Sequence, residues 1–123
     1  MILVDTSIWI DHIRAGDVIL NDLLMAGKVL IHPWVTGEVA VGLQRNRKVI
    51  LDNLADLPQA DPATDDEIMR FIEINSLFGT GIGYIDAGLL ASTKLTSGAS
   101  LWTRDKRLRA AAEALSLDAK LTH

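Results

Sequence analysis

Near its N-terminus the chain reads Met1-Ile2-Leu3-Val4-Asp5-Thr6-Ser7, so four apolar residues run directly into an acid and two hydroxyls. A short, unbroken apolar run is typical of a strand that is buried on both faces in a parallel sheet. Either Thr6 or Ser7 is a suitable N-cap for a following helix, which we expect to end near Gly16. The opening therefore predicts a strand and then a helix, with Asp5 at the carboxyl end of the strand.

The rest of the chain repeats this alternation of strand and helix. Two further apolar segments predict strands at residues 29–32 and 99–103. Apolar residues at helical spacing predict helices within residues 17–27, 33–43, 49–54, 64–72, 84–95 and 108–115. The fourth of these begins with a capping box, Thr64 to Glu67, and residues 117–121 suit either a short edge strand or a frayed tail. We expect one α/β domain over residues 1–123 with a mostly parallel central sheet.

Composition limits the function classes that remain. The 123 residues include no Cys, which excludes disulfides, thiolate metal sites and Cys nucleophiles. The net charge of −4 argues against a nonspecific, charge-driven nucleic-acid binder, although it leaves room for a local basic patch. The N-terminus lacks the basic region of a signal peptide, and no apolar run approaches the length of a membrane span. We therefore expect a cytoplasmic protein.

Several common catalytic motifs are missing from the sequence. The loop from Gly79 to Tyr84 fails the dinucleotide pattern GxGxxG, because Tyr84 occupies the last glycine position. The P-loop pattern and the hydrolase signatures GxSxG, SxxK and HExxH do not occur. We interpret His12 and His32 as a helix-surface and a strand-end residue, not as ligands.

Four acids occupy corresponding places at the ends of predicted elements. Asp5 closes the first strand, Glu38 lies in the helix after the second, Asp86 begins the 84–95 helix, and Asp105 follows the 99–103 strand. Each acid alone is well explained as a helix cap or a dipole partner. In an open parallel sheet, however, strand carboxyl ends and the following helix N-termini share one edge, where ligands bind. All four carboxylates are therefore candidates for a common site.

Clustered carboxylates repel one another unless a proton or a cation intervenes. An all-oxygen donor set without Cys or His favours Mg²⁺ or Mn²⁺ over zinc. The reaction that suits such a site is phosphodiester hydrolysis by a metal-activated water, with either one or two ions.

With these residues the sequence resembles the PIN-domain family, and more closely the VapC-type toxin ribonucleases of type II toxin–antitoxin modules. The resemblance covers essentially the whole chain. It rests on residues 2–11, on Glu38, on Asp86 before Leu89-Leu90-Ala91, and on the segment Leu101 to Leu108. No departure from the family pattern occurs at the four acids.

The resemblance implies a three-layer α/β/α fold and a Mg²⁺- or Mn²⁺-dependent endoribonuclease, usually a homodimer, that a cognate antitoxin protein inhibits. It also implies roles for single residues. Asp5 and Asp86 would be the principal metal ligands, Asp105 a further acidic member, and Glu38 a ligand or a water-orienting base. Hydroxyls of Thr6 or Ser7 would hydrogen-bond Asp5, and Thr103 would be a hydroxyl neighbour of the acids.

Four basic residues surround Asp105 in an otherwise acidic protein. They are Arg104, Lys106, Arg107 and Arg109. RNA phosphate is a natural partner for such a rim, and a solvated helix face is an equally good explanation. The tryptophans Trp9, Trp34 and Trp102 adjoin apolar segments and are expected in the core or at an interface.

Two other functions stay open on sequence grounds. A receiver-like phosphoacceptor domain has a similar length and alternation, but we find neither its acidic pair nor its late lysine. A non-catalytic, metal-stabilised module that binds a partner protein would use the same carboxylates. Residues 45–78 carry no recognised motif, and the sequence names neither the RNA nor the antitoxin.

Overall fold

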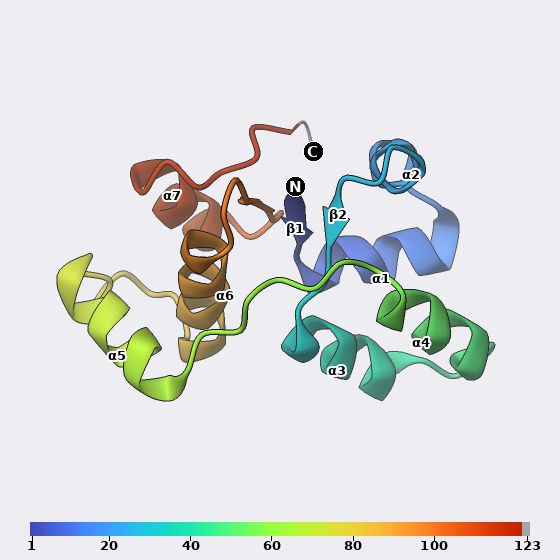
Figure 1. The fold of residues 1–123 in the computed structure, drawn as a ribbon, viewed down its shortest axis with the longest axis horizontal. Coiled ribbons are helices and arrows are strands. Elements are labelled where there is room, and N and C mark those ends of the chain that lie inside the picture. Colours follow the sequence, from blue (N-terminus) through green and yellow to red (C-terminus); the bar gives the residue numbers. More distant parts are fainter. Residues whose placement is uncertain (122–123) are drawn as a thin grey trace.

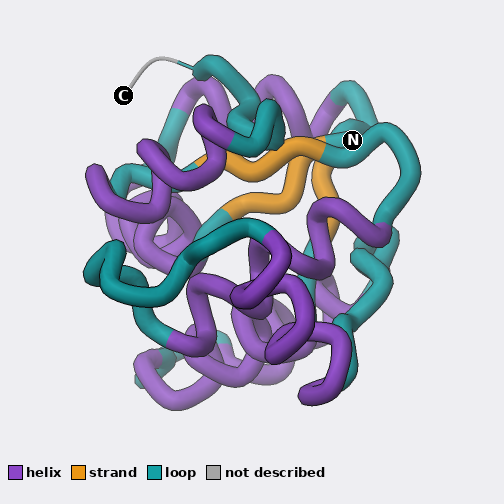
Figure 2. Tube along the Cα trace, turned by 90° about the vertical axis from the view of Figure 1, so that its left-hand side faces the viewer, coloured by secondary structure: helices purple, strands orange, loops and turns teal. Residues whose placement is uncertain are grey.

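The computed structural model describes residues 1–121. Its centre is a parallel sheet of three strands, in the order β2-β1-β3. The strands are β1 (Ile2–Val4), β2 (Val29–Leu30) and β3 (Ser100–Trp102), with Leu3 opposite Leu30 on one side and Leu101 on the other. Leu3 and Val4 are fully buried, as the unbroken apolar run predicts. Figure 2 shows these short strands enclosed by helices and loops.

Seven helices cover the sheet in the described part of the chain. They are α1 (Thr6–Ala15), α2 (Val18–Met25), α3 (Pro33–Gly42), α4 (Arg47–Ala55), α5 (Asp65–Ile74), α6 (Tyr84–Leu95) and α7 (Lys106–Ala114). Helices α1 to α4 lie on one side of the strands and α5 to α7 on the other, which confirms the predicted three-layer α/β/α arrangement (Figure 1). Along residues 1–121 no helix is both long and apolar enough to cross a membrane.

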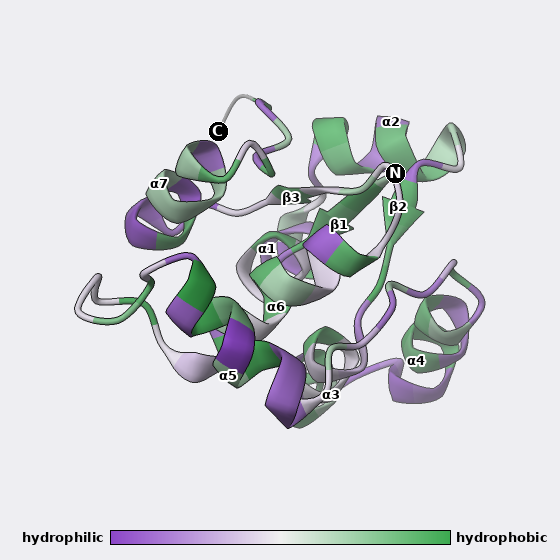
Figure 3. Cartoon of the chain, turned by 60° about the vertical axis from the view of Figure 1, so that its left-hand side comes forward, coloured by the Kyte–Doolittle hydropathy of each residue, from purple (hydrophilic) through white to green (hydrophobic). Residues whose placement is uncertain are grey.

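Hydropathy follows this layering. In Figure 3 the strands are strongly hydrophobic, and hydrophilic residues lie mainly on the outer helices α4, α5 and α7. Trp9 and Trp102 are 4% and 1% exposed, so the expectation of core tryptophans is confirmed for these two. The buried sheet thus holds the carboxyl ends of β1 and β3 in fixed positions, from which the acidic residues project.

The observed boundaries refine the predictions in two places. The N-cap of α1 is Asp5, not Thr6 or Ser7, because Asp5 itself has extended backbone and accepts a hydrogen bond from the Thr6 N–H. Residues 117–121 do not form a strand: Asp118 makes a single bridge to Leu101. The capping box of α5 is confirmed, since Thr64 and Glu67 exchange side-chain hydrogen bonds of 2.9 and 3.2 Å.

His32 follows β2 and starts α3 as a buried, neutral cap. Its Nδ1 accepts the N–H of Trp34 at 3.0 Å, so the ring proton lies on Nε2, which faces Ser92 Oγ at 3.1 Å. Burial lowers the pKa of His32 below its ordinary value of 6.5. His32 is therefore a helix cap and not the last residue of the strand predicted over residues 29–32, which ends at Leu30. Its ring joins α3 to α6.

Acidification should weaken the fold through His32. Below about pH 6.5 the unfolded chain binds a proton at this histidine that the folded chain excludes, so stability falls with falling pH by up to about 1.4 kcal/mol per unit. Urea unfolding at pH 7.5, 6.5 and 5.5 measures this dependence. His32→Asn, which keeps a capping side chain, should flatten the profile, and an equally steep profile in that variant would contradict this account.

Candidate acidic active site

The carboxylate of Asp5 is fixed at the junction of β1, β3 and α1. Its N–H donates to the carbonyl of Trp102 at 2.9 Å, which holds the residue at the carboxyl end of the sheet. One carboxylate oxygen accepts the Thr6 N–H and the other accepts the hydroxyl of buried Thr103, both at 2.8 Å. These charge-assisted bonds hold a half-buried carboxylate in one orientation.

Asp105 lies next to this arrangement and is exposed. Its N–H donates to the hydroxyl of Thr103 at 3.1 Å, and its Oδ1 accepts the N–H of Leu108 at 2.9 Å as the N-cap of α7. Thr103 therefore connects the two acids, since its hydroxyl donates to Asp5 and accepts from Asp105. The capping role foreseen for a single acid is present here together with proximity to Asp5.

Asp86 shows that the four acids share one electrostatic environment. It is the third residue of α6 and is half-buried. Burial raises the pKa of its carboxyl, and the negative charges of Asp5, Asp105 and Glu38 raise it further against a lowering hydrogen bond from Gly83. Glu38 is exposed on α3. Acids up to 81 positions away in sequence thus act on the carboxyl of Asp86.

The chemistry of this donor set fits a hard divalent cation. All the donors are oxygens, and the repulsion felt by Asp86 is the kind that a cation relieves. Over residues 1–121 no three His, Asp or Glu side chains converge tightly enough to enclose an ion as they stand. Mg²⁺, however, is commonly held by only one or two carboxylates with several waters. The open arrangement of the acids suits that mode of binding.

The hydroxyls next to Asp5 behave differently from the expectation. Among the described contacts of Asp5, the backbone N–H of Thr6 takes the place of a Thr6 or Ser7 hydroxyl, because Thr6 is the first helical residue behind the Asp5 cap. Ser7 is exposed. The Thr6 hydroxyl oxygen is buried and has no hydrogen-bond partner within residues 1–121.

Arg104 is bound to the protein itself, which differs from the expectation of a cation facing RNA. Its Nη1 lies 2.7 Å from Asp11 and its Nη2 lies 2.5 Å from Asp17. Burial raises the pKa of Asp17, but the N–H of Leu20 and the charge and hydrogen bond of Arg104 outweigh it, so this pKa is held below its ordinary value. The sequence showed Asp17 only as the start of α2 and gave no signal for the role of Asp11.

The other three basic residues divide into two kinds. Arg109 pairs with Glu113 on its own helix at 3.0 Å. Lys106 and Arg107 are exposed and enter no ion pair with the described residues. A Cβ added to Gly81 would lie 2.9 Å from Nη1 of Arg107, so this side chain covers the glycine loop that leads to Asp86. Arg107 therefore stands between the segments that carry Asp105 and Asp86.

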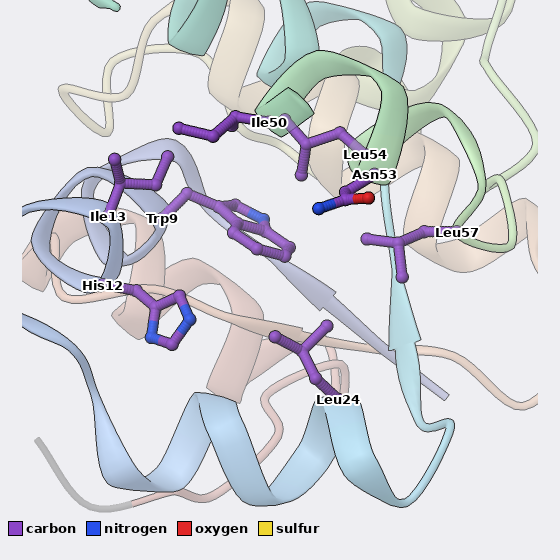
Figure 4. A pocket seen from close by; sticks show the side chains of 8 residues that line it. All are labelled: Trp9, His12, Ile13, Leu24, Ile50, Asn53, Leu54 and Leu57. Carbon is purple, nitrogen blue, oxygen red and sulfur yellow. The ribbon is translucent and has the colours of Figure 1, made fainter. Parts of the chain in front are cut away.

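A separate pocket of about 310 Å³ lies between α1, α2 and α4 (Figure 4). Its lining is mostly apolar and consists of Trp9, His12, Ile13, Leu24, Ile50, Asn53, Leu54 and Leu57. The indole Nε1 of Trp9 is buried and finds no hydrogen-bond partner within residues 1–121. None of the four acids belongs to this described lining, so the pocket is distinct from the acidic edge.

Comparison with known proteins agrees with this fold. The chain belongs to the PIN-domain family, which its sequence matches over residues 2–114. It is also 50% identical over 111 residues, covering 90% of each chain, to Ribonuclease VapC32 from two strains of Mycobacterium tuberculosis. The predicted resemblance to the PIN-domain family and its VapC-type members is thereby confirmed. Because the chain is a PIN domain, the alternative of a receiver-like phosphoacceptor domain is wrong.

Proposed function

We propose that this protein is a metal-dependent endoribonuclease and the toxin of a type II toxin–antitoxin pair. The observation that carries the proposal is the pair of hydrogen bonds by which the Thr103 hydroxyl links Asp5 to Asp105 at the end of β3. The raised pKa of Asp86, to which the charges of Asp5, Asp105 and Glu38 contribute, supports a common site for the four acids. Carboxylates gathered at the carboxyl edge of a parallel sheet are suited to hold a cation and the phosphate that it binds. The name Ribonuclease VapC32, carried by relatives with 50% identity, supports RNA as the substrate. We further propose that the protein acts in the cytoplasm.

The surroundings of each residue determine the role that we propose for it. Asp5 and Asp86 would hold Mg²⁺ or Mn²⁺, with Asp105 and Glu38 as exposed carboxylates that bind it or orient a water. When bound, the ion supplies a water of lowered pKa and neutralises charge on the phosphate. Thr103 keeps the Asp5 carboxylate in place through its 2.8 Å hydrogen bond. Lys106 and Arg107 would contact the RNA backbone, whereas Arg104 and Arg109 are already paired.

A cognate antitoxin and a second copy of the chain are the protein partners that we propose. VapC-type family membership supports both. Exposed apolar side chains on and after α5, Ile74 at 69% and Phe78 at 61%, are available for a protein contact. Sedimentation of the purified protein measures the homodimer directly.

Cleavage of total RNA by antitoxin-free protein tests the proposed function. We expect discrete fragments with Mg²⁺ or Mn²⁺ and none with EDTA, because the acids need the cation to act on phosphate. Cleavage that persists in EDTA would contradict metal dependence. Folded protein that binds Mn²⁺ and leaves every RNA intact would favour the non-catalytic binding module.

Arg107 and Arg109 provide a matched pair for the RNA contact. Arg107→Ala should weaken binding of single-stranded RNA and reduce the log–log salt slope by about 0.7, the value for one phosphate contact on a single strand. Arg109→Ala should leave the slope unchanged, because Arg109 is paired with Glu113. Fluorescence anisotropy between 50 and 300 mM salt (about a sixfold range, within which screening changes strongly) measures both. Equal slopes for Arg107→Ala and the wild type would remove Arg107 from the RNA surface.

A further inference from the structure

Arg104 connects the acidic site to the opposite layer of helices. In sequence it lies between Thr103 and Asp105, which bond to each other at 3.1 Å. Its side chain instead reaches α1 and the start of α2, where it bonds Asp11 and Asp17 through separate nitrogens at 2.7 and 2.5 Å. One side chain therefore ties the exit of β3 to the α1–α2 junction, 87 and 93 residues away in sequence.

The partners of Arg104 are themselves fixed. Asp17 is the N-cap of α2, where it accepts the N–H of Leu20 at 2.9 Å, and its own N–H donates to Nδ1 of His12 at 3.0 Å. The side chains of Arg104 and Asp17 are only 27% and 15% exposed, so water screens this pair less than a surface pair. The guanidinium also lies 5.6 Å from the ring of buried Trp102. The planar guanidinium of Arg104 is thus contacted by Asp11, by Asp17 and by the Trp102 ring, and it has little freedom to move.

The guanidinium of Arg104 restrains residues 103–105, and these residues orient the carboxylates of Asp5 and Asp105. Thr103 donates to Asp5 and accepts from Asp105, so a displacement of residues 103–105 would move both acids. We propose that Arg104 is a positioning residue, whose ion pairs with Asp11 and Asp17 hold the Thr103–Asp105 turn and thereby the Asp5 and Asp105 carboxylates. The proposal rests on the function proposed above and adds a structural partner to its site.

A direct contact between Arg104 and RNA predicts a different response to mutation. If Arg104 acts on RNA, Asp17→Asn should release its guanidinium toward the substrate and strengthen binding. If Arg104 acts by positioning, Asp17→Asn should resemble Arg104→Ala. Asn is as good an N-cap as Asp, so Asp17→Asn keeps the start of α2 while removing the charge that Arg104 needs.

The test combines hydrogen exchange on the protein alone with steady-state cleavage. Arg104→Ala and Asp17→Asn should each speed exchange of the Asp105 and Leu108 amides about tenfold, because the first donates to Thr103 within the restrained turn and the second donates to the Asp105 carboxylate at its end. Both variants should lower kcat about tenfold with little change in KM. Arg104→Lys should not restore either readout, because an ammonium cannot bond both carboxylates in the same geometry. Arg109→Ala should leave both readouts as in the wild type.

Unchanged exchange at Asp105 in Arg104→Ala would overturn the proposal. So would a raised KM and a shallower salt slope in Arg104→Ala combined with stronger RNA binding in Asp17→Asn, which would assign Arg104 to RNA. A wild-type protein that cleaves no RNA counts against the proposed function, while the exchange measurement still tests the restraint of the turn.

Discussion

Asp86→Asn should lower RNA cleavage by at least about a hundredfold and leave the fold no less stable than the wild type. Loss of residues that merely support metal ligands costs about 10- to 100-fold, so loss of a ligand charge should cost at least the upper value. The stability expectation has a separate cause. Burial and the charges of Asp5, Asp105 and Glu38 raise the pKa of Asp86, which means that the ionised carboxylate costs stability in the folded chain relative to the unfolded chain. A neutral amide of the same size removes that repulsion.

The combination of lost activity and retained stability separates a functional carboxylate from a structural one. Asp22→Asn is a matched control, because Asp22 is an exposed acid on α2, remote in sequence from every proposed ligand. Cleavage rates and urea midpoints for both variants decide the matter. Folded Asp86→Asn with wild-type cleavage would show that Asp86 holds no essential metal.

Asp5→Asn should abolish cleavage in the same way and also preserves the fold. Asn caps helices as well as Asp does, so the Thr6 N–H keeps an acceptor. The Thr103 hydroxyl can reverse its role and accept from the new amide. Loss of folding in this variant, measured by circular dichroism, would mean that the Asp5 charge is structural.

The architecture was predictable because strongly periodic and strongly punctuated segments determine it. The apolar run before Asp5 gave the central strand, and the capping box at Thr64 gave the start of α5. Boundaries depended on weaker local differences. Asp5, Thr6 and Ser7 all have side chains that can cap a helix, and only the backbone conformation selects Asp5. Residues 117–121 have strand-like composition, but they contact the sheet through a single bridge.

The acids of the candidate site were accessible to sequence reasoning, whereas their connections were not. Position at strand ends pointed to Asp5 and Asp105, because parallel topology brings such positions to one edge. The pairing of Arg104 with Asp11 and Asp17 joins segments far apart in the chain, and no local pattern encodes it. A run of basic residues in the sequence therefore does not distinguish a side chain that faces RNA, as proposed for Arg107, from one that binds the protein itself, as Arg104 does.

Gly88→Ala should destabilise the fold by up to about 2 kcal/mol, although alanine is the better helix former. Replacing a helical glycine by alanine ordinarily gains about 1 kcal/mol. Here a Cβ on Gly88 would overlap Cζ3 of Trp34 and lie 3.1 Å from Cδ1 of Ile68, contacts that force a shift. Overpacking of this kind costs about 1–3 kcal/mol, and it outweighs the gain in helix propensity. The ring centroids of His32 and Tyr84 lie 5.1 and 6.4 Å from that of Trp34, so these two rings limit how far the Trp34 ring can move away from Gly88.

Gly37→Ala isolates the helix-propensity part of this balance. Gly37 is exposed within α3, and a Cβ there meets nothing within 4 Å, so the alanine variant should be about 0.5–1 kcal/mol more stable than the wild type. Urea unfolding should therefore show changes of opposite sign in the free energy of unfolding of the two variants. Trp34 and Glu38 share α3, while Gly88 and Asp86 share α6, so the displacement in Gly88→Ala should also alter the spacing of two proposed site residues. We expect Gly88→Ala to cleave RNA more slowly at temperatures where it is fully folded. If Gly88→Ala instead stabilises the fold, Trp34 moves aside freely, and the contact between α3 and α6 does not set the spacing of the acids.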